Sequence, residues 1–383
     1  MTLRPRSSNA GAADAAPIRV LFLPDFSDAN PYQRELRTAL ESRGVSVSGA
    51  RAPGRDPVAI LRSWLTNGRP PVVHLHWTHN YLGQRADGSS ARFARVRAAL
   101  FLGQVRILRA FGVRIVWTVH NLGHHDAAGT AGLNARVHRR LVGLSDAVIC
   151  HCEAALEAVT VTYGIRARDR DRLHVIPHGN YVNVYGPSRT RDDTRRSLGM
   201  PADARVLLFV GAVRAYKGLA DLAAAFRDVQ RTDVRLVIAG KAATEADARE
   251  LSDAAAADPR IDLRLGFVPD DELPVLLGAA DAVVLPFRDI LTSGSAILAM
   301  SYGRAVIAPS LGCLPETLDP DAAIIYDPLG PDALKGALEL ALDTDLNAMG
   351  AHARLLAERL AWGPIAAATA ELYRRPESGW EHA

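Results

Sequence analysis

Short apolar runs recur along the chain, and stretches of helical, amphipathic character separate them. This alternation predicts parallel strands that are buried on both faces and connected by helices. The predicted strands of the first half are 18–24, 45–48, 71–77, 114–120, 146–151 and 172–179. Those of the second half are 205–213, 234–240, 261–267, 281–287 and 305–310. The pattern therefore indicates an α/β protein with two doubly wound, Rossmann-like units.

A polar, arginine-rich segment, 186–204, interrupts the alternation between the two halves. We predict an N-terminal domain over residues 17–186 and a C-terminal domain over residues 187–360. Residues 1–16 are expected to form a disordered tail, and residues 361–383 are expected to return to the N-terminal domain. Ligands of such sheets bind beyond the carboxyl ends of the strands, so the loops that follow the strands are where we expect the chemistry.

The composition narrows the function classes. A net charge of +3 over 383 residues is too small to indicate a nucleic-acid-binding face. The spacing of Cys150, Cys152 and Cys313 fits neither a zinc site nor a disulfide framework, which favours a reducing compartment. No run reaches the roughly 18 apolar residues of a spanning helix, and the first residues lack the apolar run of a signal peptide. We therefore expect a cytoplasmic protein.

Two loops of the second half have the residues of a phosphate site. In the first, GAVRAYKG, Arg214 and Lys217 stand at a strand-to-helix turn, where a guanidinium and an ammonium group are suited to clamping a diphosphate. The alternative is that both are solvated cations on an ordinary loop. In the second, Thr292, Ser293, Gly294 and Ser295 open an apolar helix, whose free N–H groups attract phosphate without a charged side chain. The alternative is that a serine merely caps that helix.

Histidines follow two strands of the first half. His120 comes just after one strand, with His124 and His125 nearby, and His76 and His79 follow another. A zinc site is conceivable, but the spacing is not H-E-x-x-H and no carboxylate is interleaved. We therefore expect no metal, and His120 is the preferred histidine of the catalytic cleft.

Three segments together resemble the GT-B glycosyltransferases, and glycosyltransferase family four in particular: GAVRAYKG, the PHG turn at 177–179, and TSGSAILAMSYGRAVIAPSLGCLPE at 292–316. The resemblance implies two Rossmann-like domains that face each other across a cleft. It implies that Arg214 and Lys217 hold the diphosphate of a nucleotide-sugar donor, that the loop 292–295 meets the same pyrophosphate, and that His120 lies beside the transferred sugar. It also implies that neither a metal ion nor another cofactor is required.

The sequence departs from that family at its paired glutamates, which stand eight positions apart. Leu298 occupies the second glutamate position and Ile290 the first, with Asp289 adjacent. We expect Asp289 to substitute for the first glutamate beside the sugar. Glu316 is the candidate for holding the nucleoside ribose in place of the second.

The same departure leaves the stereochemistry open. The resemblance implies retention of the anomeric configuration. The alternative is inversion, in which a base on the acceptor side, Asp25, His79 or His120, deprotonates the acceptor hydroxyl.

The expected activity is transfer of a hexose, first of all mannose from GDP-mannose, to a saccharide, lipid-linked or small-molecule hydroxyl. The alternatives are a nucleotide-sugar epimerase of the same fold and a catalytically silent binding partner. Residues 92–114 contain six arginines, no acidic residue and several large apolar residues. This segment predicts either a peripheral contact with an anionic membrane or a helix that covers the sheet with a basic outer edge.

Overall fold

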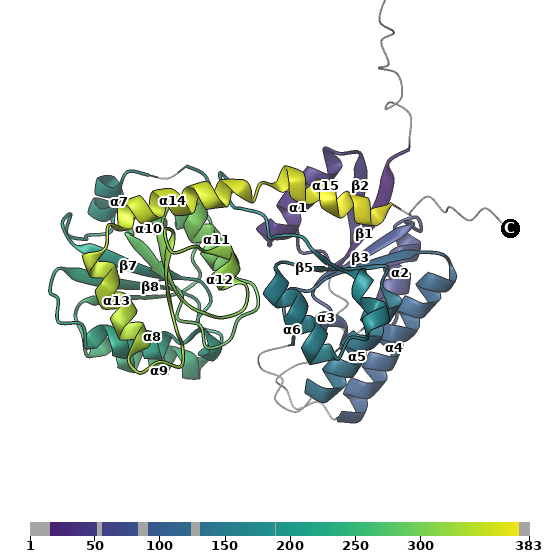
Figure 1. Cartoon of the computed structure of the whole chain (residues 1–383), viewed down its shortest axis with the longest axis horizontal. Helices are drawn as coiled ribbons and strands as arrows, with labels where there is room; N and C mark the ends of the chain where they lie inside the picture. Colours follow the sequence, from purple (N-terminus) through teal and green to yellow (C-terminus); the bar gives the residue numbers. More distant parts are fainter. Residues whose placement is uncertain (1–15, 52–55, 83–90, 124–130, 188, 375–383) are drawn as a thin grey trace, which may run out of the picture.

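The computed structural model describes residues 16–51, 56–82, 91–123, 131–187 and 189–374. Almost all of the predicted N-terminal tail, together with His124, His125 and the end of the chain after residue 374, lies outside the described residues. The described chain forms two lobes, each built on a six-stranded sheet with helices on both faces (Figure 1). All strand pairs in both sheets are parallel, which confirms the predicted fold class.

The N-terminal lobe contains a sheet of order β2-β1-β3-β4-β5-β6. Its strands are β1 (Ile18–Leu23), β2 (Val45–Gly49), β3 (Val72–Leu75), β4 (Arg114–Thr118), β5 (Ala147–Cys150) and β6 (Leu173–Val175). Its helices are α1 (Pro31–Glu41), α2 (Ala59–Thr66), α3 (His79–Leu82), α4 (Ala91–Ala110), α5 (Ala131–Leu144) and α6 (Glu153–Tyr163). Every residue of β3 and β5 is buried, because helices cover both faces of the sheet.

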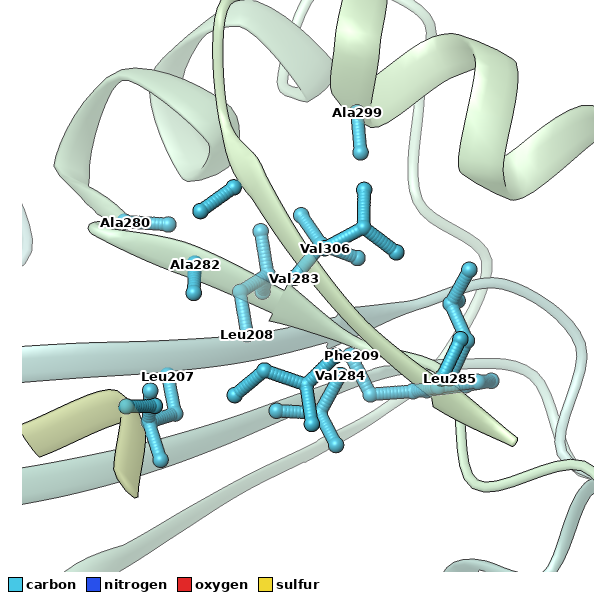
Figure 2. Close-up of a cluster of buried hydrophobic side chains, with 14 of the residues drawn as sticks. Leu207, Leu208, Phe209, Ala280, Ala282, Val283, Val284, Leu285, Ala299 and Val306 are labelled. Carbon is cyan, nitrogen blue, oxygen red and sulfur yellow. The ribbon is translucent and has the colours of Figure 1, made fainter. Parts of the chain in front are cut away.

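The C-terminal lobe contains a sheet of order β12-β11-β10-β7-β8-β9. Its strands are β7 (Arg205–Val210), β8 (Val234–Gly240), β9 (Ile261–Leu265), β10 (Ala282–Val284), β11 (Ala305–Pro309) and β12 (Ala323–Tyr326). Its helices are α7 (Arg191–Ser197), α8 (Leu219–Arg227), α9 (Glu245–Ala256), α10 (Leu273–Ala279), α11 (Gly294–Ser301), α12 (Leu314–Thr317), α13 (Ala333–Asp343) and α14 (Leu346–Arg359). Side chains of β7, β10 and β11 interlock in the core (Figure 2). The short edge strand β12 was not among the predicted strands.

The arginine-rich segment between the halves is more than a connection. It contains helix α7, and the Arg195 side chain on that helix is buried. Its guanidinium donates to Asp281 Oδ2 at 2.7 Å and to the carbonyl of Ala279 at 3.1 Å. An arginine that is buried and paired in this way belongs to the domain core, so reading the whole segment as a polar connection was wrong.

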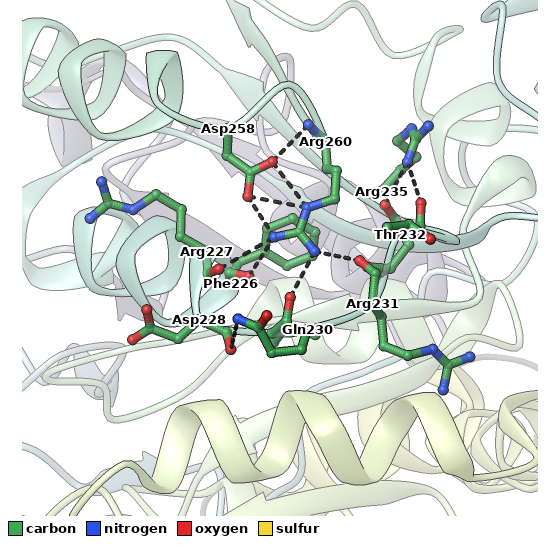
Figure 3. A network of polar contacts seen from close by, with 11 residues as sticks. Phe226, Arg227, Asp228, Gln230, Arg231, Thr232, Arg235, Asp258 and Arg260 are labelled. Carbon is green, nitrogen blue, oxygen red and sulfur yellow. Dashed lines mark hydrogen bonds and ion pairs between the residues drawn. The ribbon is translucent and has the colours of Figure 1, made fainter.

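A partly buried arginine fixes the end of α8. Arg260 pairs with Asp258, lies 4.9 Å from the ring centre of Phe226, and donates to backbone carbonyls at the end of α8 and in the turn that follows (Figure 3). The last carbonyls of a helix lack intrahelical donors, and this guanidinium supplies them. Arg260 therefore caps the C-terminal end of the helix that follows Lys217.

The chain crosses between the lobes twice. After β6, residues 176–187 lead from the first lobe to the second, and α15 (Trp362–Tyr373), which follows α14, packs against α1 in the first lobe (Figure 1). The two crossings touch, since Trp362 Nε1 donates to the carbonyl of Asn180 at 2.7 Å. A Cβ at Gly179 would lie 2.3 Å from the Trp362 ring, so glycine permits this contact.

A disulfide joins the lobes at a third place. Cys152, which precedes α6, is bonded to Cys313, which precedes α12, with 5.8 Å between their Cα atoms. The expectation that no cysteines pair was wrong, because residues 161 positions apart in sequence meet only when the two lobes face each other. Disulfides are rare in reducing compartments, so the bond also removes the support that the cysteines gave to a cytoplasmic location.

Candidate active site

Lys217 lies at the cleft end of the C-terminal sheet. The turn after β7 is a short 3-10 helix, Ala215–Lys217, and Gly218 at φ +66° is the N-cap of α8. The Lys217 ammonium lies 5.4 Å and 5.6 Å from the ring centres of Phe209 and Phe287. Burial, assisted by the charge of Arg214, lowers the pKa of Lys217 to about 8. Lys217 is therefore not a solvated loop lysine but a half-buried cation held on aromatic faces.

The mouth of α11 lies beside this ammonium. The Ser293 side chain caps the helix by accepting a hydrogen bond from the Ala296 amide at 3.1 Å. This cap was the alternative to a phosphate site in the sequence analysis. The cap leaves the amides of Gly294 and Ser295 without a hydrogen-bond partner among the described residues. A Cβ placed on Gly211 would lie 3.3 Å from Lys217 Nζ and 3.9 Å from Ser295 Oγ. The ammonium and the helix mouth therefore converge on one small space, which a side chain at position 211 would narrow.

The other candidates of this lobe are more exposed. Arg214 is exposed at the start of the turn after β7. Asp289 is exposed in the loop between β10 and α11, next to Arg288, whose guanidinium forms a bidentate pair with Asp221 at 2.7 Å. Thr292 is half-buried, with its hydroxyl 3.6 Å from Cys313 Sγ. The roles of these residues toward a donor stay predictions.

A row of imidazoles lines the cleft end of the N-terminal sheet. The four neighbouring strands β3, β4, β5 and β6 are each followed by one histidine of the row: His76, His120, His151 and His178. Successive ring centres are 5.5, 5.6 and 5.4 Å apart. Tyr32 of α1 packs against all four rings. His151 and His178 were not among the predicted site residues; a histidine at the end of each of four successive strands is the signal that identifies them.

The row is uncharged. Burial, followed by the proximity of other imidazoles, holds the pKa of His76 and of His120 well below the usual histidine value. Burial lowers the pKa of His151 to about 4 and that of His178 to about 3. His178 also reaches the other lobe, since a Cβ on Gly294 would lie 4.0 Å from its Nε2. A neutral imidazole edge thus faces a cationic edge across the cleft.

His120 and His79 line a small cavity of about 20 Å³, together with His76, Trp77 and His138. The Trp77 ring stacks on His120 at 4.3 Å and 13°. Within the described residues, three candidate metal-ligand atoms come together only at Asp319, Asp321 and His352, away from this row. The described histidines of the row do not form such a group.

Asp25 is held by its neighbours. Burial raises its pKa, but hydrogen bonds from the Ser27 hydroxyl and amide and from Arg37 outweigh that effect, and the pKa is lowered. The Arg37 guanidinium lies 2.5 Å from its Oδ2. A carboxylate stabilised as its anion in this way is a weak general base.

Glu316 bridges the lobes in this structure. Its two carboxylate oxygens accept from the amides of Glu153 and Ala154, at 2.9 and 2.6 Å, at the N-terminus of α6. The neighbouring cavity of about 260 Å³ is lined from both lobes, by His151 and His178 on one side and by Thr292, Ser293 and Ile297 on the other. A role for Glu316 toward a ribose requires that the carboxylate leave α6, and it stays a prediction.

The chain is similar to glycosyltransferases over most of its length. A family model described as Glycosyltransferase Family 4 matches residues 19–180, and one described as Glycosyl transferases group 1 matches residues 204–344. GDP-mannose:glycolipid 4-beta-D-mannosyltransferase of Xanthomonas campestris pv. campestris is 29% identical over 321 residues, which cover 82% of this chain and 81% of that protein. D-inositol 3-phosphate glycosyltransferase of Xylanimonas cellulosilytica is 28% identical over 395 residues, with 92% and 94% covered.

Among solved structures, sucrose-phosphate synthase from Thermosynechococcus elongatus superimposes with a TM-score of 0.74 at 20% identity, covering 93% of this chain and 98% of that one. At this identity the likeness concerns the fold, including the arrangement of the two lobes. The two family models match separate parts of the chain, since one match ends at residue 180 and the other begins at residue 204.

Proposed function

The chain belongs to the GT-B glycosyltransferases of the family-four type, and from that premise we propose that it transfers mannose from GDP-mannose to a hydroxyl of a saccharide or lipid-linked acceptor, without a metal ion. The observation that carries the proposal is the meeting of Lys217 with the mouth of α11. The Xanthomonas relative, whose name specifies GDP-mannose and a glycolipid, supports this choice of donor and acceptor class.

The proposed chemistry needs charge stabilisation at the leaving diphosphate. Negative charge builds there as the glycosidic bond breaks, and the Lys217 ammonium and the α11 amides are preorganised beside each other to meet it. Arg214, exposed at the same turn, is assigned to the outer oxygens of the diphosphate. These groups supply the positive charge that a divalent cation provides in other phosphoryl sites.

We also propose retention of the anomeric configuration, because two of the three candidate bases, Asp25 and His120, are poorly suited to deprotonating an acceptor. Asp25 is stabilised as its anion by Ser27 and Arg37, and Nε2 of His120 is already hydrogen-bonded to His76. Nuclear magnetic resonance of the product decides between retention and inversion through the one-bond coupling between C1 and H1 of the transferred mannose. An inverted product would overturn retention and would fit the β-linkage in the name of the Xanthomonas relative.

Thermal unfolding with GDP, UDP and ADP sugars tests the donor. A ligand at about 100 times its dissociation constant adds roughly 2.7 kcal/mol of stability. We expect the largest shift with GDP-mannose, and transfer only when an acceptor is present. Conversion of the sugar without an acceptor would instead identify an epimerase, and absence of both shift and turnover would identify a silent binding partner.

The acceptor side of the proposal includes contact with an anionic membrane through α4. Phe93, Val96, Leu100, Ile107 and Phe111 are exposed and recur at helical spacing, so they form one stripe along α4 and just past its end. Other side chains of α4, on its inner face, pack into the lobe core. The exposed stripe is therefore not needed for core packing.

Basic side chains accompany the stripe. Arg95 and Arg106 are exposed next to it, and neither α4 nor the adjoining α5 contains an acidic residue. An apolar stripe with cationic flanks fits the headgroup region of an anionic bilayer. No helix among the described residues is long and apolar enough to cross a membrane, so the proposed contact is peripheral.

Vesicle co-sedimentation tests the contact. We expect binding to phosphatidylglycerol vesicles, weaker binding at high salt, and loss of binding in a Phe93→Ser, Phe111→Ser double variant. Leu355→Ser on α14 removes an equally exposed apolar side chain elsewhere and serves as the control. Equal sedimentation of the double variant and the parent would refute the assignment of α4.

A further inference from the structure

Two histidines of the row have a tautomer that their partners fix. His151 Nδ1 lies 3.0 Å from the carbonyl oxygen of Ile176, and His178 Nδ1 lies 2.7 Å from that of Gly179. A carbonyl only accepts, so in both rings the proton is on Nδ1. Nε2 of His151 is then a buried lone pair without a partner.

The partners of His76 decide its tautomer in the same way. His76 Nδ1 lies 3.2 Å from His120 Nε2, and one proton is shared between these two nitrogens. His76 Nε2 is buried and has no hydrogen-bond partner. If His120 donated, the proton of His76 would have to be on Nε2, where it would be a buried N–H donor without an acceptor, and such donors are rarer in folded proteins than unpaired acceptors. If His76 donates, only a lone pair is left unpaired, as in His151.

We propose that His76 is a positioning residue that donates from Nδ1 to His120 Nε2 and thereby holds His120 in the Nδ1–H tautomer. Any hydrogen bond from His120 to a substrate is then made by Nδ1–H. His120 accordingly acts as a donor to a sugar or acceptor oxygen and not as a general base. Trp77, stacked on the His120 ring, fixes the orientation of that donor.

His74, a buried histidine within β3, differs from His76, which follows that strand, in this respect. Its Nδ1 lies 2.7 Å from the Tyr373 hydroxyl and its Nε2 lies 2.8 Å from Thr118 Oγ1, so both nitrogens have partners. Hydroxyl groups both donate and accept, and they permit either tautomer of His74. His76 has only one partner, another imidazole, and this is why its proton determines the state of His120.

The tautomer is measurable without a substrate. In protein labelled with 15N-histidine, long-range proton–nitrogen correlation spectra distinguish protonated from unprotonated ring nitrogens, and a His120→Asn variant assigns the signal. We expect His120 to have a protonated Nδ1 and an unprotonated Nε2 at neutral pH. A protonated Nε2 in the parent protein would overturn the proposal, whatever the enzyme transfers.

Variants of His76 provide the second readout. The side-chain amide of His76→Asn places an N–H donor near the position of Nδ1, whereas His76→Leu removes the donor. We expect His76→Leu to lose the Nδ1–H signature of His120, and His76→Asn to keep it. His138→Leu, at another buried histidine of the same cavity, is the control and should leave the His120 signal unchanged.

The kinetic prediction rests on the proposed glycosyl transfer. Misplacing a catalytic group by about 1 Å can cost up to about 100-fold in rate. We expect His76→Leu to lower kcat by about that factor with KM for the donor unchanged, and His76→Asn to restore most of it. An equal loss in both variants would show that His76 is merely structural. Absence of transfer in the parent would refute the proposed function and leave the spectroscopic test intact.

Discussion

The two edges of the cleft differ in how their chemistry is assembled. The C-terminal edge combines a cation and a helix mouth, each within a single strand-to-helix connection. The N-terminal edge has uncharged imidazoles from four separate strands, fixed by Tyr32 and by one another. In the proposed function, the first edge holds the anionic diphosphate, and the second presents neutral donors and acceptors to sugar hydroxyls. Variants at the two edges should therefore fail in different ways.

The largest effect is expected at Lys217. Lys217→Met keeps the stem on Phe209 and Phe287 but removes the charge, so turnover should fall about a hundred- to a thousandfold, or roughly 2.7–4 kcal/mol. The ligand-free fold should be at least as stable as the parent, because a desolvated ammonium is lost. Steady-state rates and thermal unfolding check both parts.

Lys335→Met on α13 is the matched control, since that lysine pairs with Glu339 outside the cleft. If Lys217→Met turned over about as fast as the parent, the diphosphate site would not lie at this edge. The proposed difference between the two edges would then be wrong.

The disulfide ties the two edges together, and breaking it is the next largest perturbation. Removing a disulfide typically costs roughly 2–4 kcal/mol, so a thiol reductant should lower the unfolding temperature of the parent. The Cys313→Ser variant should have this lower unfolding temperature from the start, and a reductant should not lower it further. Alkylation of the unreduced protein should label Cys150 alone once it is unfolded. Labelling of all three cysteines would contradict the covalent tie.

The pH dependence of nucleoside diphosphate binding tests whether the charge of the C-terminal edge comes from Lys217. The folded pKa of Lys217, about 8, lies below its ordinary value of 10.5, so the ammonium is present below about pH 8 and lost above it. Affinity for GDP should therefore fall above pH 8, by up to about tenfold per pH unit. Without ligand, the cost of burying the charge destabilises the fold below pH 8 and is relieved as the pH rises from 8 to 10.5.

Titration calorimetry at pH 8.5 in two buffers of different ionisation enthalpy should show proton uptake on GDP binding. Affinity that is constant from pH 7 to 9.5, with no proton uptake, would mean that Lys217 is not the group that meets the diphosphate. His120 and its neighbours remain neutral through this range and should contribute nothing to the profile.

Glu316 should give the smallest effect. Glu316→Gln removes the charge that faces the N-terminus of α6, where such interactions contribute about 0.3–1 kcal/mol. Thermal unfolding should show a small decrease, and GDP affinity should stay unchanged if α6 is the main partner of this carboxylate. A strong loss of affinity for the nucleoside with no loss of stability would instead support its predicted role at the ribose.

The candidate residues of the C-terminal edge were easier to single out from the sequence than those of the N-terminal edge, for a physical reason. Strand, turn and helix mouth are local, so Arg214, Lys217 and the segment 292–295 could be identified from short stretches. The histidine row exists only because four strands lie side by side, and only two of its members, His76 and His120, were noticed as strand-end histidines. The burial of Lys217 depends on Phe287, which is distant in sequence.

Other differences have the same origin. The edge strand β12 was not recognised, and its place in the sheet is set by its pairing with β11, a contact that the sequence does not show. The pairing of Arg195 with Asp281 and that of Cys152 with Cys313 both join residues that are far apart in the sequence. The alternation of strands and helices, by contrast, is dictated by burial on both faces, and every predicted strand is present.

Calorimetric titration of GDP into Lys217→Met and His120→Asn, beside the parent, tests the division of roles between the two edges most directly. The account predicts that His120→Asn binds GDP as tightly as the parent and yet transfers sugar slowly, whereas Lys217→Met has lost most of its affinity. Weakened GDP binding in His120→Asn, together with parental affinity in Lys217→Met, would contradict it.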